Sequence, residues 1–170
     1  MMDYKKLSVL MYLADRDCVV LYNDSMSFDM LESKEHGPVL SETFRLMEGR
    51  QKSKPDGWNS RIEGLDGDFL LVKEELLGCD TDDLDELSEA DCEIMDNIWE
   101  EFKDIDISER KFKRYIRRNC PEWKPPTGTH EGKESNLITV DDLCEALEFS
   151  KARTNGLKRL LENEPGLRWD

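Results

Sequence analysis

The feature that most limits how this chain can fold is a block of acidic residues in its middle. Between residues 74 and 109, sixteen acids stand against a single base, Lys103, so the block carries a net charge of −15, the charge of the whole chain. Carboxylates in such number are not buried together, because each buried charge requires a partner. The acids of the block are therefore expected in a solvated loop and on a solvated helix face. The block predicts a solvated surface that also steers a basic partner toward the protein.

A strongly basic segment follows this block directly. Its sequence, RKFKRYIRR, places six bases around Phe112, Tyr115 and Ile116, and these three residues have the spacing of one helix face. The pattern predicts a surface helix whose bases pair with acids of the block. A helix that contacts nucleic-acid phosphates is the alternative, and the large negative charge beside it disfavours that partner.

Cysteine usage and hydropathy indicate an intracellular protein. The five cysteines are odd in number and widely spaced, and none forms the C-x-x-C pair of zinc ribbons and redox sites. We therefore expect reduced thiols and a cytoplasmic setting. The apolar stretch near the N-terminus is interrupted by Asp15, Arg16 and Asp17, so it predicts a buried helix and not a signal peptide. No other stretch reaches the roughly eighteen apolar residues of a membrane span, so we expect no membrane partner.

Helical periodicity is clearest at the N-terminus. Apolar residues recur at helical spacing between Asp3 and Leu21, and Leu13 and Val20 widen this stripe, so we expect a central helix there. Large aromatic side chains also belong mostly to the core of a chain this size. The expected core aromatics include three tryptophans: Trp58, Trp99 and Trp123.

Glycine and proline divide the next part of the chain. Gly37-Pro38 predicts a turn after a short extended segment, and a helix is expected over residues 39–47. Residues 49–60 have the composition of a loop, and residues 62–72 predict a small hairpin. The acidic residues 78–86 predict a further loop.

Two capping boxes mark helix starts in the second half of the chain. Ser88 with Asp91, and Thr139 with Asp142, have the spacing at which the two side chains bond each other's backbone N–H groups. Ser108 is expected to cap the basic helix. The expected helices run from Ser88 to Lys103, from Ser108 to Asn119, from Thr139 to Phe149, and around Leu157–Leu161. Together these elements predict an α+β fold, a mostly α-helical single domain with one or two small β-hairpins.

The sequence offers no set of residues with the pattern of a catalytic or metal site. His36 and His130 are its two histidines, and both lie in expected turns or loops. No nucleophile elbow, zinc-protease motif or phosphate-binding glycine loop is present. The acids of residues 80–85 lack the EF-hand frame. We therefore expect no enzymatic activity, no cofactor and no bound metal.

Several short segments carry a resemblance to a known family. The segment LMYLADR, residues 10–16, and the segment HGPV, residues 36–39, resemble two motifs of the Panacea domain, the SocA-like antitoxin family. Similar matches occur at the segments LSEAD, PEW and ITVDD, residues 87–91, 121–123 and 138–142. In their order along one chain, they extend over about residues 7–147.

The resemblance implies an antitoxin that neutralises its cognate toxin by direct protein–protein binding. Some members of the family instead hand the toxin to a AAA+ protease. We expect residues 1–149 to form the Panacea domain and residues 150–170 to add a C-terminal helix and tail packed on it. The alternative function is a phage or mobile-element inhibitor that presents its acids to a defence protein as a mimic of nucleic acid. The oligomeric state is left open.

The partner-binding residues are expected around the first helix, the Gly37-Pro38 turn and the acidic loop. Asp15 is also expected to accept hydrogen bonds from the backbone of the turn at residues 36–38, as a structural role. The full set of candidate contact residues comprises Tyr12, Asp15, Arg16, His36, Gly37, Pro38, Glu42, Asp82, Asp83 and Asp85.

Overall fold

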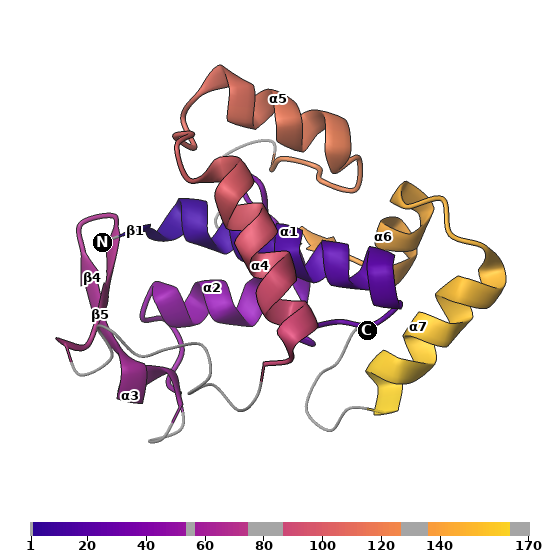
Figure 1. The fold of residues 1–170 in the computed structure, drawn as a ribbon, viewed down its shortest axis with the longest axis horizontal. Coiled ribbons are helices and arrows are strands. Elements are labelled where there is room, and N and C mark those ends of the chain that lie inside the picture. The colour runs from indigo at the N-terminus through magenta and orange to yellow at the C-terminus, as the bar shows by residue number, and fades with distance from the viewer. Residues whose placement is uncertain (1, 54–56, 75–86, 127–135, 164–170) are drawn as a thin grey trace.

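The first helix is the element around which the other parts of the fold are arranged (Figure 1). A computed structural model describes residues 2–53, 57–74, 87–126 and 136–163 of the chain. Asp3 is the N-cap residue of helix α1 (Tyr4–Tyr22), and its carboxylate accepts from the Lys6 N–H at 2.9 Å. The buried residues of α1 face several directions. The expected central helix is therefore confirmed.

The last turn of α1 departs from the expected buried stripe. Val20 is 37% exposed and Leu21 is 61% exposed. The helix continues past the elements that cover its middle, and Asn23 ends it in a left-handed conformation. The spacing of Val20 and Leu21 fits a helix, but in the described part of the chain their side chains are not covered as the stripe predicted.

Two small antiparallel sheets lie on the first half of the fold. One contains β1 (Met2–Asp3), β5 (Phe69–Val72) and β4 (Ile62–Asp66) in that order, and the other contains β3 (Pro38–Leu40), β2 (Leu31–Ser33) and β6 (Leu137–Ile138). The predicted hairpin at residues 62–72 is confirmed. Each sheet gains a strand from a distant segment, which local patterning does not reveal.

The residues after Gly37 form a strand and not the start of a helix. Val39 and Leu40 pair with Glu32 and Leu31, so α2 begins only at Ser41 and runs as Ser41–Met47. The predicted start at residue 39 is wrong because strand pairing and burial compete successfully with helix formation. Within the expected loop 49–60, a short helix α3 (Trp58–Arg61) also forms, and Trp58 is half-buried.

Helix α4 (Glu89–Phe102) crosses α1 and has the predicted capping box. Ser88 Oγ accepts from the Asp91 N–H at 3.2 Å, and Asp91 Oδ2 accepts from the Ser88 N–H at 3.0 Å. Trp99 is predicted in the core but is 39% exposed. The reason is that the contact with α1 covers only part of the stripe of apolar residues on α4. Trp123 is buried, as predicted.

Helix α5 (Arg110–Asn119) is the predicted basic helix, and it begins one residue later than expected. Glu109 is its N-cap residue, because the Ser108 hydroxyl instead donates to Asp106 at 2.5 Å. Phe112 and Ile116 are fully buried against the rest of the core, and Phe102 packs edge-on against Phe112.

The C-terminal helices cover the far end of α1. Helix α6 (Val140–Ala146) has the predicted Thr139–Asp142 capping box, and α7 (Lys151–Asn163) buries Leu157 and Leu161. From α7, Arg153 donates to the Val19 and Val20 carbonyls at 3.2 and 2.5 Å. The α+β, mostly helical fold is thus confirmed, with one core cluster that draws residues from all the larger elements. Within the described ranges, no helix is both long and apolar enough to cross a membrane.

Gly37 is predicted to be sensitive to any side chain, because a Cβ there would lie 3.0 Å from Val9 Cγ2 in the core. Gly37→Ala should lower the free energy of unfolding by about 1–3 kcal/mol, as overpacked cores do, measured by urea denaturation. Gly64 is the matched control, because its φ of 148° is close to the 158° of Gly37 but a Cβ there meets open space. Equal losses at both sites would contradict the steric explanation. In a Val9→Ala background, the further loss caused by Gly37→Ala should be smaller, whereas that caused by Gly64→Ala should be unchanged.

Candidate partner-binding surface

A buried carboxylate connects two segments that are more than a hundred residues apart. Tyr12 Oη donates to Glu122 Oε1 at 2.6 Å, and Arg16 Nε donates to the same oxygen at 2.7 Å. The Glu122 side chain is fully buried, and the Arg16 side chain is 13% exposed. Burial and the Glu122 charge raise the pKa of Tyr12 well above its ordinary value, so its hydroxyl stays protonated and donates.

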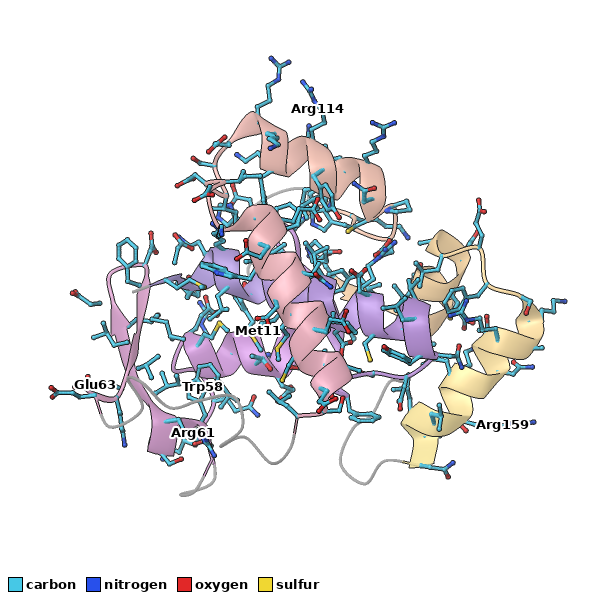
Figure 2. The ribbon with its side chains drawn as sticks, in the orientation of Figure 1. Met11, Trp58, Arg61, Glu63, Arg114 and Arg159 are labelled. Atoms are coloured by element: carbon cyan, nitrogen blue, oxygen red, sulfur yellow. The ribbon has the colours of Figure 1, made fainter. Side chains whose placement is uncertain are left out.

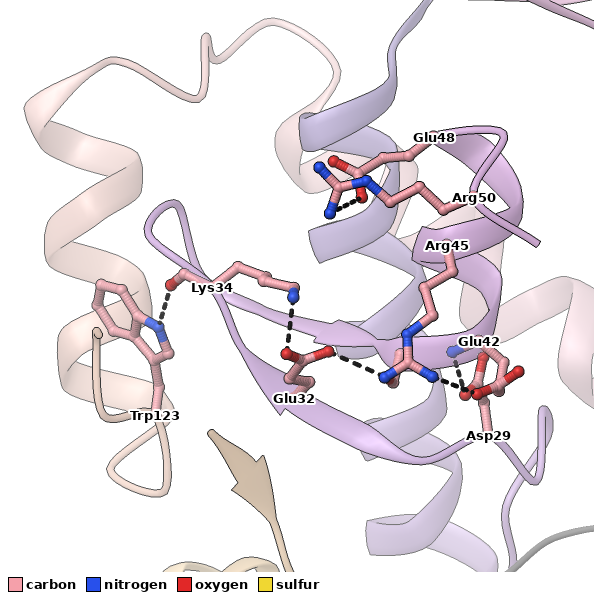
Figure 3. A network of polar contacts seen from close by, with 9 residues as sticks. Asp29, Glu32, Lys34, Glu42, Arg45, Glu48, Arg50 and Trp123 are labelled. Atoms are coloured by element: carbon pink, nitrogen blue, oxygen red, sulfur yellow. Dashed lines mark hydrogen bonds and ion pairs between the residues drawn. The ribbon is translucent and has the colours of Figure 1, made fainter. Parts of the chain in front are cut away.

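The neighbours of Glu122 extend this connection to the second sheet. Trp123 Nε1 donates to the Lys34 carbonyl at 2.9 Å, at the turn that leads into Gly37 (Figure 3). Burial, aided by the Glu122 charge, raises the pKa of the Cys120 thiol to about 12, so it remains a neutral core residue. The segments at residues 10–16, 36–39 and 121–123 therefore meet in one part of the fold.

Asp15 holds a different segment from the one predicted. Its carboxylate accepts from the Ser27 N–H at 2.7 Å and from the Ser25 hydroxyl at 3.0 Å, and no described contact joins it to the backbone of residues 36–38. Burial raises the pKa of this carboxyl, and the bonds from Ser27 and Ser25 oppose that shift. The prediction of its partner was wrong because the chain folds back directly after α1, so residues 25–27 reach the carboxylate first.

Acidic residues that the sequence did not single out organise the start of α2 (Figure 3). Asp29 accepts from the Glu42 and Thr43 N–H groups, both at 2.8 Å, and so caps α2 from a preceding segment. Glu32, which is buried, accepts from the Ser41 hydroxyl at 2.9 Å and the Lys34 ammonium at 2.7 Å. Their spacing from α2 matches no known capping motif, so sequence patterns could not identify them.

The seven predicted contact residues that the structure describes do not form one exposed patch. Tyr12, Asp15, Gly37 and Pro38 are buried. Arg16, His36 and Glu42 are half-buried, and Glu42 pairs with Arg45 at 2.8 Å. Asp82, Asp83 and Asp85, with the predicted loop 78–86, lie outside the described residues. Those that are described shape the scaffold beneath a surface, and their contact with a partner stays a prediction.

An open apolar groove of about 280 Å³ lies between α1 and α4. Met11, on α1, is one of the residues that line this groove (Figure 2). Most of the groove lining is apolar, and the polar residues that the structure places along the groove are Asp15, Ser27 and Asp96. The apolar lining residues are Met2, Leu7, Leu10, Met11, Ala14, Met26, Leu40, Met95, Ile98 and Trp99. Sequence patterning missed the groove, because Met11, Met95 and Trp99 have the spacing of fully buried stripes.

The basic face of α5 forms a second exposed feature. Arg114 points away from the body of the molecule in Figure 2. None of the six bases of this helix forms an ion pair with an acid in the described ranges, so the expected pairing with the block is not seen for residues 87–109. The remaining acids of the block, at residues 75–86, lie outside those ranges.

The described residues contain no group of three or more His, Cys, Asp or Glu side chains arranged to hold a metal ion. His36 lies half-buried in the turn before Gly37, and His130 is outside the described ranges.

One comparison with known proteins gives a match. A family model described as "Antitoxin SocA-like, Panacea domain" matches residues 7–124. The matched range contains the Glu122 cluster and all of the groove residues except Met2, and it ends before α6 and α7. Comparisons with curated proteins and with solved structures give no match.

The bonds to Glu122 are predicted to contribute much more to stability than a similar pair at the surface. Glu122→Gln should lower the free energy of unfolding by about 3 kcal/mol, because it leaves the Arg16 side chain, which is only 13% exposed, without a countercharge. Tyr12→Phe should cost about 1.5–3 kcal/mol, the range for a hydrogen bond to a charged group. Urea denaturation of both variants and the double variant measures the coupling between them.

The control for this cycle is Glu42→Gln, which makes the same change in a more exposed pair. Its side chain is 29% exposed and that of Arg45 is 40% exposed, so the loss should stay below about 1 kcal/mol. Additive losses from Tyr12→Phe and Glu122→Gln would show that the two side chains do not act together.

Proposed function

The chain belongs to the antitoxin SocA-like Panacea family, and on that premise we propose that it neutralises a cognate toxin by binding it directly, without catalysis. The family match over residues 7–124 is the observation that carries this proposal. Neutralisation by binding requires an accessible surface and no reacting groups.

The surface of the matched domain supports a protein partner. The groove exposes apolar side chains, including Trp99, and contiguous exposed apolar surface is characteristic of sites of protein contact. Tryptophan is also enriched among the residues that dominate binding energy. We propose that the partly exposed Arg16, His36 and Glu42 add polar contacts at the edge of this interface.

We propose further that the acidic residues from Asp80 to Glu93 speed the encounter with a basic toxin. The block at residues 74–109 concentrates the negative charge of the chain, and a field of one sign raises association rates. The partner-binding roles of Asp82, Asp83 and Asp85 belong to this step. In this proposal the protein acts in the cytoplasm, residues 1–149 form the antitoxin domain, and residues 150–170 pack on it.

The proposal includes two routes to neutralisation. In the first route, the bound protein blocks the toxin itself. In the second, it acts as an adaptor that delivers the toxin to a AAA+ protease, as some members of the family do. The toxin's half-life in cells separates these routes, because only the second shortens it and depends on the protease.

The alternative function is that of an acidic inhibitor that mimics nucleic acid toward a defence protein. The observation in its favour is the density of carboxylates at residues 74–109. Binding by mimicry depends on the carboxylates themselves, whereas an apolar interface uses them mainly to attract the partner.

Co-expression with the product of the adjacent open reading frame tests the proposed function. We expect that product to stop growth when it is expressed alone. Co-expression of the present chain should restore growth, and the chain should retain the product in a pull-down. A neighbour that is harmless alone, or that this chain does not retain, would refute the antitoxin function. Toxin levels after a translation block then distinguish the two routes.

Neutralising the acidic loop is predicted to slow association and to leave dissociation unchanged. The triple substitution Asp82→Asn, Asp83→Asn, Asp85→Asn should reduce the association rate constant by about tenfold at low salt, with the difference vanishing at high salt. Stopped-flow measurements with the toxin give both rate constants.

The control removes the same number of charges from the C-terminal region, by Glu145→Gln, Glu148→Gln and Glu162→Gln, all exposed side chains. A similar slowing in the control would assign the effect to net charge and not to the loop. Complete loss of binding in the loop variant would instead support the mimic.

A further inference from the structure

The size of the groove between α1 and α4 limits what can occupy it. Its volume is about 280 Å³. An apolar cavity of about 150 Å³ accommodates a benzene molecule, so this groove has room for about two side chains of leucine or phenylalanine size. It is too small for a whole secondary-structure element. An occupant would therefore insert anchoring side chains and keep its backbone outside.

The walls of the groove are adaptable, and part of its floor is fixed. Met2, Met11, Met26 and Met95 come from four different segments, and the unbranched thioether chain adjusts to irregular apolar shapes. Below them, Leu10, Leu40 and Ile98 are each no more than 5% exposed. Asp15, bonded to Ser27 and Ser25, also holds the segment that carries Met26. This combination suits apolar anchors of varied shape.

The lining also favours one backbone conformation in the occupant. A strand leaves alternate backbone N–H and C=O groups in need of partners, and a helix satisfies its own. The groove offers mainly apolar side chains of α1 and α4, with only three polar residues along it. An amphipathic helix that presents two anchors one turn apart therefore matches it better than an extended peptide.

The charge beside the groove specifies the polar face of that helix. Helix α4 forms one wall, and its exposed residues include five acids and no base: Glu89, Glu93, Asp96, Glu100 and Glu101. Asp96 lines the groove itself. Lys6 is the base beside Trp99, and it already donates to the Lys103 carbonyl at 2.9 Å. Complementarity to this wall requires lysine or arginine next to the anchors.

We infer that this groove seats two apolar side chains of a basic amphipathic helix of the protein partner. The assignment of that partner as the toxin rests on the proposed function, whereas the groove's preference for such a helix does not. Trp99 closes one side of the site, and the acids of α4 orient the helix.

The experiment uses the methyl groups of the methionines as reporters in the full-length protein. The probe is a synthetic peptide helix with leucine at positions i, i+3, i+4 and i+7 and lysine elsewhere. At physiological ionic strength, NMR of ¹³C-methyl-methionine protein should show shifts of Met2, Met11, Met26 and Met95. Met30 and Met47 lie outside the groove and should keep their positions.

Two control peptides separate the apolar and charged contributions. Replacing the leucines by serine should abolish the shifts, because the anchors are lost. Replacing the lysines by glutamate should weaken binding by about tenfold or more, because the acids of α4 then repel the helix. Equal binding of the lysine and glutamate peptides would overturn the charge assignment.

Matched protein variants test the same contacts. Met95→Gln keeps the length of the side chain and should weaken the lysine peptide by about tenfold, whereas Met30→Gln, outside the groove, should not. Asp96→Asn should weaken it more than Asp104→Asn, an exposed acid away from the groove. Unfolding midpoints establish that each variant is folded. Equal effects within either pair would overturn the site.

Other occupants give different outcomes. Shifts of the four methyl groups on adding a small apolar molecule, with none on adding the peptide, would make the groove a small-molecule site and refute the inference. Shifts that depend on protein concentration alone would assign it to a second copy of the chain, and would refute it also.

Neutralisation in cells separates this inference from the proposed function. If Met95→Gln loses the peptide but still neutralises the toxin, the groove is not the toxin's contact and the inference fails while the antitoxin function stands. If the wild-type chain binds the peptide but neutralises no neighbouring toxin, the proposed function fails and the groove's preference stands.

Discussion

The carboxylate of Glu122, shared by Tyr12 and Arg16, is the interaction on which the arrangement of the domain depends. It lies in the segment after α5 and binds the middle of α1, so it fixes the C-terminal side of the domain to its first helix. Next to it, Trp123 bonds the turn between β2 and β3. One short segment thus orients α1, the second sheet and α5 together. One oxygen of this buried carboxylate, Oε1, accepts from both Tyr12 and Arg16, and the Arg16 charge offsets part of the cost of burial. The other oxygen, Oε2, has no hydrogen-bond partner among the described residues.

The groove follows from the number of elements that α1 must contact. Helix α1 already packs against β3, α2 and α4, and Arg153 of α7 bonds its last turn. The half-exposed methionines of the groove lie beside α1 and α4. A crossing helix covers only part of a neighbour's surface, so apolar side chains remain accessible beside it. The same geometry leaves Trp99 partly exposed on α4. The proposed binding surface and the core are therefore made from the same two helices.

The charge of the chain is separated between two neighbouring helices. The exposed face of α4 is acidic and that of α5 is basic, and in the described residues the two faces do not pair. Opposite charges on one surface favour orientation of a partner as well as attraction, because each end of the partner meets a different field. This separation is already present in the sequence, which places sixteen acids before six bases.

Local patterns in the sequence determined much of this protein. The apolar periodicity of α1 and the capping boxes at Ser88 and Thr139 are interactions between residues a few positions apart, so spacing alone predicts them. The segments that carry the family resemblance are also short, and the family match over residues 7–124 includes all of them except residues 138–142. Only the tertiary structure decided which partners distant residues have: Glu122 for Tyr12, and the third strand of each sheet. The groove, too, is seen only in the tertiary structure. The spacing of apolar residues along a helix is the same whether that face is covered or open, and its exposure depends on which other elements pack against it.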